Sequence, residues 1–323
     1  MDILAYGSGH PHKRPIRSMK TLILGSNGQV GWELQRALAP LGSVISLSRH
    51  GDCGLAGDLA GPGNVADTVR KVSPDVIVNA AAYTAVDSAE TEPDRAVLIN
   101  TSAVSMLARE AHSLGAWLVH YSTDYVFDGS GTRPWQENDA PAPLNVYGKT
   151  KRDGELAVED SGCRHLIFRT SWVYAARGNN FIHSMLRLAS ERDALDIVND
   201  QYGAPTGAAL IADVTAHALR MLVNGSGASG LFHLTASGET TWHGYAIRII
   251  ERARDAGWPV SVAPGNIKPI GTDAFPTKAR RPRNSRLDCT RLEQTFGLRM
   301  PPWQAGVDHA LSEILHNGMA LPK

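Results

Sequence analysis

The sequence predicts an α/β protein with a doubly wound parallel sheet and a smaller α/β domain toward the C-terminus. In the first half of the chain, short apolar runs alternate with stretches of helical periodicity, as in strands joined by crossover helices. The first run, residues 21–24, also ends in a glycine-spaced turn that opens into an amphipathic helix. A strand, a glycine turn and a helix in this order are typical of a dinucleotide-binding sheet of the Rossmann type.

The turn after the first strand is the predicted site for the pyrophosphate of a dinucleotide. Its spaced glycines allow a tight turn, a close approach of the backbone to the pyrophosphate and close packing of the helix. The new helix would present free N–H groups to the anion. Because loops are rich in glycine in any case, the prediction depends on the position of these glycines between a strand and a helix. The expected cofactor contacts here are Gly25, Asn27, Gly28, Gln29, Val30 and Gly31.

The end of the second strand, residues 43–47, predicts which nicotinamide cofactor binds. NAD-binding proteins usually carry an acidic side chain there for the ribose hydroxyls, whereas an arginine and small hydroxyls accommodate the 2′-phosphate of NADP. This chain has Ser48 and Arg49 and no acid at that point. We therefore expect NADPH to be preferred and NADH to be possible. Asp58 and Leu59 are candidate adenine contacts, and a turn or helix-capping aspartate is the equally good alternative.

The third strand, residues 76–78, opens into small residues that would let a cofactor lie against the backbone. Open parallel sheets bind ligands at the carboxyl ends of their strands. Packing against a neighbouring helix would require small side chains as well. A long helix over residues 93–114 and a strand over 117–121 are expected to follow. The cofactor contacts expected after the third strand are Ala80, Ala81 and Ala82.

Three residues in the middle of the chain predict carbonyl chemistry. Tyr147 and Lys151 lie four residues apart, on one face of a helix that Pro143 would begin. An ammonium beside a phenol favours the phenolate and lowers its pKa, so the tyrosine becomes a usable proton donor. The hydroxyl of Thr123, at the end of the preceding strand, would reach the same carbonyl. A solvated helix face and a strand-end cap are the alternatives for these residues taken singly.

Composition narrows the class of protein. The 323 residues include 32 basic and 32 acidic side chains, which argues against a general nucleic-acid or membrane-surface binder. Three cysteines without paired spacing predict reduced thiols, with no disulfide and no zinc site. No apolar run reaches the length of a membrane span, and the first residues lack the features of a secretory signal. We expect a cytoplasmic protein.

The chain divides into three parts at the level of the sequence. Residues 1–18 show no periodicity and are expected to be a flexible leader or tag. Residues 19–170 form the expected dinucleotide-binding domain. Residues 171–323 are expected to bind substrate for the most part, with segments that return to the first domain. In this last part, helices are expected from residue 181 and over 208–223, and Thr241 is expected to cap another helix.

The chain from residue 19 to about 315 resembles the extended short-chain dehydrogenase/reductases, and among them the dTDP-4-dehydrorhamnose reductases. The glycine turn and the Thr, Tyr and Lys residues carry the wider resemblance. The narrower one depends on motifs that cover nearly the whole chain. The matching stretches are residues 25–41, 75–87, 121–127, 143–151, 168–174, 199–207 and 280–287.

This resemblance implies a reaction. Hydride would pass from the nicotinamide to C4 of dTDP-6-deoxy-L-lyxo-4-hexulose (dTDP-4-dehydro-6-deoxy-L-mannose), giving dTDP-L-rhamnose in the last step of its synthesis. Tyr147 would supply the proton, Lys151 would hold the nicotinamide ribose and lower the pKa of Tyr147, and Thr123 would hydrogen-bond the sugar oxygen. Asp124 lies where sugar-nucleotide dehydratases place the first of two acids. Its successor is Tyr125, so the pair used for elimination is missing.

The resemblance also implies where the dTDP-sugar binds. Trp172 would lie close to the sugar, and a core or rim tryptophan is its alternative. Residues 278–286 are the most basic stretch of the chain. They could be a solvated loop or bind RNA nonspecifically, but guanidinium groups that fork onto a diphosphate explain them better. The expected substrate contacts are Thr84, Val86, Thr123, Asp124, Trp172, Arg281, Asn284 and Ser285.

The chain departs from the family at a metal site. Some similar proteins join two subunits through a divalent ion held by glutamates. Glu33 and Glu313 align with two of these positions, but the third is Ala209. Mg²⁺ needs hard oxygen ligands in near-octahedral order. We therefore expect a weak site or none, and this places the homodimer contact in question.

Two other functions remain open at this stage. One is a non-catalytic NADP-binding regulatory subunit, such as the beta subunit of methionine adenosyltransferase, which shares this fold. The other is a sugar-nucleotide epimerase or dehydratase, which recycles its NAD. The retained Thr123, Tyr147 and Lys151 argue against the first, and Arg49 together with Tyr125 argues against the second.

Overall fold

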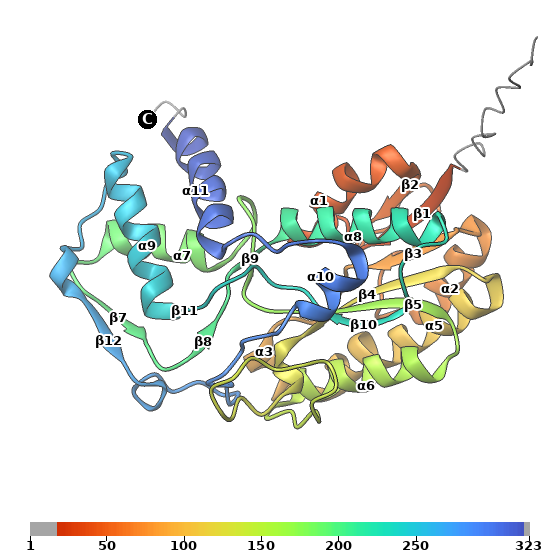
Figure 1. The fold of residues 1–323 in the computed structure, drawn as a ribbon, viewed down its shortest axis with the longest axis horizontal. Coiled ribbons are helices and arrows are strands. Elements are labelled where there is room, and N and C mark those ends of the chain that lie inside the picture. Colours follow the sequence, from red (N-terminus) through yellow and green to blue (C-terminus); the bar gives the residue numbers. More distant parts are fainter. Residues whose placement is uncertain (1–17, 320–323) are drawn as a thin grey trace, which may run out of the picture.

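A six-stranded parallel sheet organises the larger part of the molecule (Figure 1). The computed structural model describes residues 18–319; the predicted leader lies almost wholly outside the described residues. All neighbouring strands run parallel, and β1 lies between β2 and β3, so the winding of the chain reverses there. The predicted doubly wound fold is confirmed. In spatial order the strands are β10 (Gly230–His233), β5 (Arg164–Thr170), β4 (Trp117–Thr123), β3 (Val76–Asn79), β1 (Met19–Leu24) and β2 (Gly42–Leu47).

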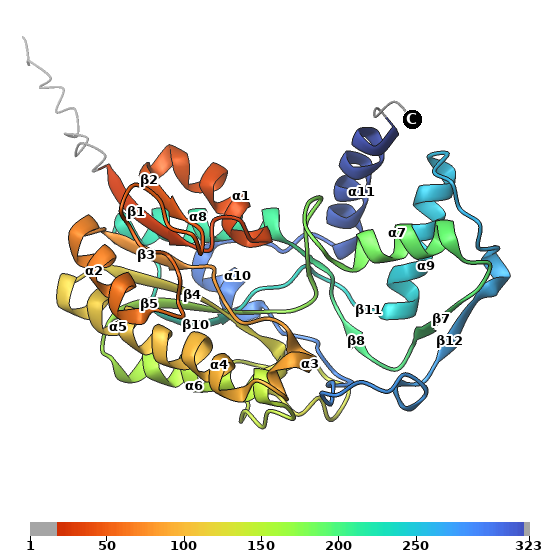
Figure 2. The same ribbon diagram turned by 180° about the vertical axis from the view of Figure 1, so that it is seen from behind.

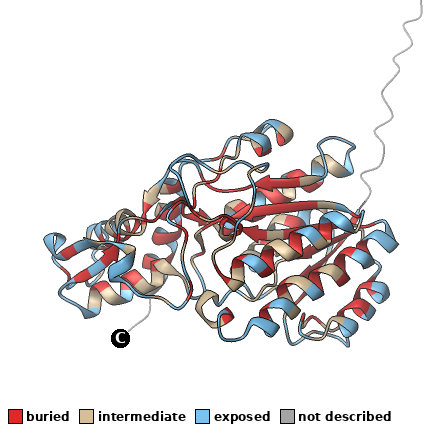
Figure 3. Ribbon diagram, turned by 90° about the horizontal axis from the view of Figure 1, so that it is seen from below, coloured by how far each residue is buried: buried red, intermediate tan, exposed pale blue. Residues whose placement is uncertain are grey.

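Helices cover both faces of this sheet (Figures 1 and 2). Successive strand residues point to opposite faces, so Leu22 packs into one core cluster and Ile23 into the other. Both clusters are fully buried along the central strands (Figure 3), which explains the continuous apolar runs in the sequence. One face carries α1 (Gln29–Leu38), α8 (Ala208–Val223) and α10 (Thr290–Phe296), and the other α2 (Pro62–Val72), α5 (Ala103–Leu114) and α6 (Val146–Asp160).

The long helix predicted over residues 93–114 is divided. It consists of α4 (Pro93–Val97), a π-helical segment (Leu98–Ser102) and α5. Within the π-helical segment, the buried amide of Asn100 accepts from Tyr83 N at 2.9 Å and donates to Tyr83 O at 3.1 Å. The widened turn therefore holds the loop between β3 and α3 (Val86–Ala89), which periodicity alone could not indicate.

A smaller lobe with its own core stands beside the sheet (Figure 1). Its helices pack around Tyr245 and Val307, and its two longer strands, β7 and β12, pair in parallel. Asn180 and Thr241 accept hydrogen bonds as N-caps of α7 and α9, as expected for Thr241. The elements are α7 (Phe181–Glu191), β7 (Leu195–Val198), α9 (Trp242–Asp255), β12 (Ile267–Ile270) and α11 (Trp303–Met319).

Short strand pairs and returning segments connect the two parts. Strand β10 and helices α8 and α10 belong to the sheet and its layers although they follow residue 171 in the sequence. Among residues 18–319, no helix is long and apolar enough to cross a membrane. Cys53, Cys163 and Cys289 are free thiols. The short pairs are β6 (Val173–Tyr174) with β9 (Thr206–Gly207), and β8 (Tyr202–Gly203) with β11 (Thr240–Thr241).

Candidate active site

The glycine turn packs directly against the end of β3. Gly25 has a φ of +90°, and its N–H donates to the carbonyl of Leu47 at 2.8 Å. A Cβ on Gly25 would lie 2.8 Å from Ala81 N, and a Cβ on Gly31 would lie 2.1 Å from the Gly25 oxygen. Neither position accepts a side chain. The winding of the sheet reverses at this edge, where open α/β sheets bind their ligands.

The first turn of α1 is suited to a pyrophosphate. The helix begins at Gln29, and its N-cap, Gly28, has no side chain to satisfy the free N–H groups. Asn27 and Gly28 are exposed, and Val30 is half-buried. An anion placed here would accept from the backbone and lie at the positive end of the helix dipole. Ala80 and Ala82, next to Ala81 after β3, are also partly accessible.

The residues expected to contact the adenosine differ in their exposure and in their hydrogen bonds. Arg49 is exposed after β2, and among residues 18–319 it forms no ion pair. The hydroxyl of Ser48 accepts from His50 N at 3.2 Å. Asp58 accepts from Ala60 N at 3.0 Å, so its carboxylate stabilises a turn, the alternative raised for it. The side chain of Leu59 is buried in the core beneath β2.

The structure brings Thr123 and Tyr147 together. Thr123 ends β4, and its side chain lies close enough to the phenol of Tyr147 to lower the pKa of that phenol. The first turn of α6 lies against the turn that follows β4, because a Cβ on Gly148 would be only 2.1 Å from the Tyr125 oxygen. The ring of Tyr125 also packs edge-on against Tyr147, with centroids 5.8 Å apart. The tyrosine is therefore held from two sides.

The predicted helix start at Pro143 is wrong by three residues. The helix begins at Val146 because the side chain of Asn145 accepts from Gly148 N at 2.8 Å. The amide of Asn145 also donates to the carbonyl of Arg280 at 2.8 Å. The cap thus joins the catalytic helix to the basic stretch.

The ammonium of Lys151 lies within the base of the site. Its side chain is buried, Nζ donates to the carbonyl of Tyr121 at 2.5 Å, and Nζ lies 3.2 Å from His120 Nε2. Burial lowers the pKa of Lys151 to about 8, although the charge of Glu155 opposes this effect. Lys151 follows Tyr147 by one helical turn, as predicted.

The expected lowering of the Tyr147 pKa is not what the structure shows. Burial raises the pKa of this phenol to about 12; the nearby hydroxyl of Thr123 lowers the pKa, and the charge of Asp124 raises it further. Lys151 makes its hydrogen-bond contacts with Tyr121 and His120 instead. A phenol with a high pKa stays protonated at neutral pH, which is the form that gives a proton to a substrate oxygen.

Asp124 is a buried carboxyl beside the catalytic pair. Its Oδ1 accepts from the hydroxyl of Thr123 at 3.1 Å. Burial raises the pKa of Asp124 to about 7, and the hydroxyls of Ser285 and Thr123 oppose this effect. Ser285 is buried, and Asp124 Oδ2 has no hydrogen-bond partner among the described residues.

Trp172 is held in an unusual conformation at the boundary with the smaller lobe. Its φ is +48°, which is rare for a bulky residue. The indole stacks on Trp242 with ring centroids 3.8 Å apart, and a Cβ on Gly203 would lie 2.8 Å from it. Strain of this kind is kept only where surrounding contacts impose it. On the opposite side, Thr84 is exposed and Val86 begins α3, at the end of the loop after β3.

Three of the arginines in the basic stretch have acidic partners. Arg281 donates to Asp87 at 2.8 Å. Arg283 forms ion pairs with Asp273 and Asp200, and Arg286 with Glu239. These contacts argue against a wholly solvated loop, and Lys278 and Arg280 are the exposed cations without such a partner among the described residues.

Asn284 has a structural position. Only 2% of its surface is exposed. Its amide donates to Arg133 O at 2.8 Å and Ser130 O at 3.3 Å, and Trp135 Nε1 donates to its carbonyl at 3.1 Å. The side chain expected to contact the nucleotide therefore holds residues 130–135 in place.

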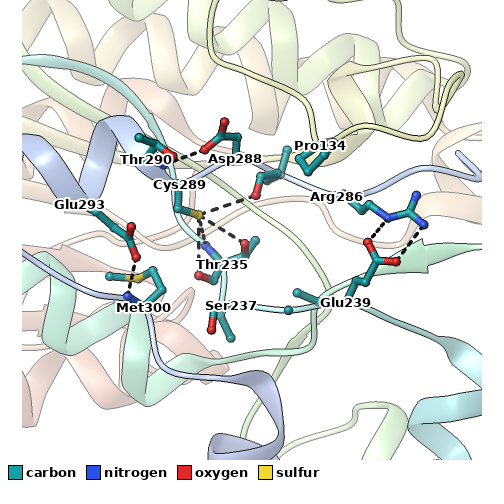
Figure 4. A pocket seen from close by; sticks show the side chains of 14 residues that line it. Pro134, Thr235, Ser237, Glu239, Arg286, Asp288, Cys289, Thr290, Glu293 and Met300 are labelled. Atoms are coloured by element: carbon teal, nitrogen blue, oxygen red, sulfur yellow. Dashed lines mark hydrogen bonds and ion pairs between the residues drawn. The ribbon is translucent and has the colours of Figure 1, made fainter.

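A pocket of about 440 Å³ lies at the C-terminal end of the basic stretch, between residues 235–239 and 286–290 (Figure 4). The Arg286–Glu239 pair stands at one side of it, and the thiol of Cys289 contacts Thr235 on the other. Thr123, Tyr147 and Lys151 are not in its lining, so this hollow is separate from the candidate active site.

The two glutamates aligned with a metal site have ordinary surface surroundings. Glu33 forms an ion pair with Arg36 at 3.5 Å, and Glu313 is exposed on α11. Over the part of the chain that the structure describes, no three His, Cys, Asp or Glu side chains are gathered as they would be around a metal ion.

Several residues of the site were not singled out from the sequence. His120 contacts Lys151, and Asn79 contacts His120. Trp242 stacks on Trp172, and Asn180 donates to Gln29 at 2.9 Å. For Asn79 and His120 a signal was available, since a polar side chain in a strand buried on both faces is unusual. The contacts of Trp242 and Asn180 join distant segments and have no local signal.

Comparison with known proteins agrees with this geometry. Residues 19–316 match the family model described as RmlD substrate binding domain. A dTDP-4-dehydrorhamnose reductase of Shigella flexneri is 55% identical over 296 residues, which cover 92% of this chain and 98% of that protein. The crystal structure of a dTDP-4-dehydrorhamnose reductase of Clostridium acetobutylicum is similar with a TM-score of 0.83 and 35% identity, covering 92% of this chain and 99% of that one. The enzyme of that name from Bacillus anthracis, in complex with NADP, has a TM-score of 0.81 and 33% identity over the same shares.

Proposed function

The chain belongs to the dTDP-4-dehydrorhamnose reductases, and on that premise we propose that Thr123, Tyr147 and Lys151 reduce the C4 keto group of dTDP-6-deoxy-L-lyxo-4-hexulose to give dTDP-L-rhamnose. The observation that carries the proposal is that Tyr125 joins the two residues, since its N–H donates to Thr123 Oγ1 at 3.2 Å and its ring packs against Tyr147. The buried ammonium of Lys151 follows Tyr147 by one helical turn. The three residues lie at the carboxyl edge of the sheet, where the chain also forms its glycine turn.

The reductases use a nicotinamide cofactor, and one solved relative holds NADP. When bound, NADPH supplies the hydride. The uncapped first turn of α1 would bind the pyrophosphate, and Ala80 to Ala82 would lie along the cofactor. Arg49, exposed and without an ion-pair partner among residues 18–319, supports a preference for NADPH over NADH, with Ser48 beside it.

The protein's own residues complete the reduction. Thr123 holds the C4 oxygen by a hydrogen bond, and Tyr147 donates its proton to that oxygen as charge develops there. The raised pKa of Tyr147 keeps this proton in place until the hydride arrives. Lys151 would hold the nicotinamide ribose. Tyr125, where a dehydratase would have a second acid, donates no proton for elimination, so reduction is the outcome.

The substrate would enter between the sheet edge and the smaller lobe. Trp172, fixed by Trp242, would flank the sugar, and Thr84 and Val86 would line the opposite side. Arg281 would reach the diphosphate from its position on Asp87. We assign Asn284 and Ser285 an indirect part, because both are buried against protein atoms. For Mg²⁺ we propose weak binding or none, since Ala209 replaces a carboxylate beside Glu33 and Glu313, and a homodimer that depends on the ion would be weakened accordingly.

The decisive experiment is a substrate panel. Purified protein is given dTDP-, UDP- and GDP-linked 4-keto-6-deoxy sugars with NADPH or NADH, and cofactor oxidation is followed together with product. Turnover with the dTDP sugar and faster turnover with NADPH are expected. Cofactor binding without turnover on any keto sugar would favour a regulatory subunit. Tightly bound NAD that survives purification and is recycled would favour an epimerase or dehydratase.

A further inference from the structure

Two buried polar residues lie beneath Lys151 and are not used in the mechanism above. Asn79 ends β3 and His120 lies beside it on β4, and both side chains are only 1% exposed. Asn79 Nδ2 lies 3.2 Å from His120 Nδ1, and His120 Nε2 lies 3.2 Å from Lys151 Nζ. The imidazole thus connects an amide to the ammonium of the site.

The hydrogen on the imidazole can be located from its neighbours. The backbone N–H of Ala81 can only donate, and it points at Asn79 Oδ1 at 3.2 Å. Asn79 therefore presents its NH₂ group to His120, so Nδ1 of the ring must accept. Burial lowers the pKa of His120 well below its usual value, and the charge of Lys151 lowers it further, so the ring is neutral. A neutral ring that accepts at Nδ1 carries its hydrogen on Nε2.

This tautomer has a consequence for Lys151. A charged ammonium can only donate hydrogen bonds, so it would place a second donor against the Nε2–H donor of His120. A neutral amine has a lone pair that accepts this N–H and can still donate to the carbonyl of Tyr121. We propose that His120, with its tautomer fixed by Asn79, is a positioning residue that stabilises the neutral form of Lys151. The inference rests on the catalytic role proposed for Lys151.

The other groups around Lys151 act in known directions. Glu155, one turn further along α6, favours the charged form of Lys151. Its carboxylate is already paired with the buried guanidinium of Arg169 at 2.7 and 2.8 Å, which offsets much of its charge. Tyr147 is neutral at physiological pH, and Tyr121 contributes only a carbonyl. His120 is therefore the group whose hydrogen-bond direction can decide between the two forms.

The contact between His120 and Lys151 would help to return a proton to Tyr147 after each reduction. Each reduction moves one hydride to carbon and one proton from Tyr147 to oxygen, which leaves a phenolate. An ammonium whose neutral form is stabilised is a better acid, so Lys151 returns a proton to Tyr147 and becomes an amine. That amine then accepts from His120 Nε2–H, and water restores its proton before the next turnover.

The tautomer can be measured without any activity. The full chain is labelled with ¹⁵N-histidine, and long-range ¹H–¹⁵N spectra are recorded between pH 6 and 9, with a His120→Gln sample to assign the signal. A neutral ring with hydrogen on Nε2 throughout is expected. An imidazolium, or hydrogen on Nδ1, overturns the proposal. This outcome is independent of whether the dTDP sugar is the substrate.

The effect on Lys151 is tested by the pH dependence of turnover. His120→Gln places an amide beside Lys151 whose oxygen can accept from the ammonium, so the pKa on the alkaline limb of kcat should rise by about one unit or more. Asn79→Asp should act in the same direction, because a carboxylate would accept from Nδ1–H and reverse the tautomer. His217→Gln on α8, away from the site, should leave the profile unchanged. An unmoved alkaline limb in both folded variants refutes the inference.

Discussion

The carboxyl edge of the sheet and the basic stretch of residues 278–286 were both identified from sequence motifs, but they differ in how the motif relates to the structure. At the edge, Thr123 and Tyr147 lie together as the motifs indicate, with Tyr125 in contact with both. In the basic stretch, Arg283 and Arg286 are paired with acids, and Asn284 holds a neighbouring loop. The first region presents its motif residues to a ligand, and the second uses most of them to hold itself in place.

The reason lies in what sets the position of each side chain. Parallel strands end at a common edge, so the order of strands and the helical period are sufficient to bring Tyr147 and Thr123 together. A loop has no such register. The positions of its arginines depend on acids such as Asp87, Asp200 and Glu239, which come from three other segments.

The largest effect is expected at the sheet edge. Tyr147→Phe removes the proton donor and should reduce kcat by about 10²–10⁴, while NADPH affinity stays nearly unchanged. Tyr121→Phe is the matched control, since its hydroxyl bonds Thr215 on the far side of the sheet. The control should retain its kcat. Stopped-flow single-turnover rates check both variants, and a Tyr147→Phe protein with full activity would show that the proton comes from another group.

The next prediction compares how much two ion pairs contribute to stability, one buried near the site and one exposed in the basic stretch. Glu155 and Arg169 are both buried, and removing one charge leaves the other uncompensated, so Glu155→Gln should lower the free energy of unfolding by about 3–5 kcal/mol. Asp273→Asn breaks the exposed pair with Arg283 and should cost less than about 1 kcal/mol. Urea titrations measure both, and equal losses would contradict the distinction between the regions.

Asp124 should make the stability of the protein depend on pH in a range where exposed carboxylates do not titrate. Burial raises its pKa from 3.8 to about 7, so between these values the folded protein retains a proton that the unfolded chain has lost. The contribution of Asp124 to stability therefore falls as pH rises toward 7 and is constant above it. Asp124→Asn should reduce the loss in unfolding free energy between pH 5 and pH 8.

A matched control for this prediction is Asp139→Asn. Hydrogen bonding to Arg133 lowers the pKa of Asp139, so this group titrates below the same pH window. Its replacement should leave the change between pH 5 and pH 8 as it is in the unmodified protein. If the two variants respond alike, the raised pKa of Asp124 is wrong.

Much of the fold and of the site could be predicted because local patterns determine them. The glycine turn, the Tyr147–Lys151 spacing and the cap at Thr241 each depend on residues within a few positions of one another. The predicted start of α6 was wrong because the side chain of Asn145 caps the helix, so the helix does not begin at Pro143. The π-helical turn depends on the contact of Asn100 with Tyr83, which a local pattern does not show.

What the sequence could not indicate is the set of long-range contacts that change electrostatics. The pKa values of Tyr147 and Lys151 depend on burial by the assembled edge, and Lys151 contacts His120, which lies 31 residues away in the chain. Nothing in the spacing of Tyr147 and Lys151 shows that the ammonium contacts a strand carbonyl. Such effects appear only once the strands and α6 are packed.

The smallest effect concerns an arginine that, unlike Arg281, Arg283 and Arg286 of the basic stretch, forms no ion pair within residues 18–319. Because Arg49 is exposed beside the cofactor edge, its guanidinium is available for a 2′-phosphate. Arg49→Asp should weaken NADPH by about tenfold or more relative to NADH, because a carboxylate repels the phosphate and can accept from the ribose hydroxyls instead. Arg283→Asp, which changes a paired arginine, should leave the ratio of the two dissociation constants unaltered. Fluorescence titration with each cofactor measures this ratio, and an unchanged ratio in Arg49→Asp would place the determinant of cofactor choice elsewhere on the edge.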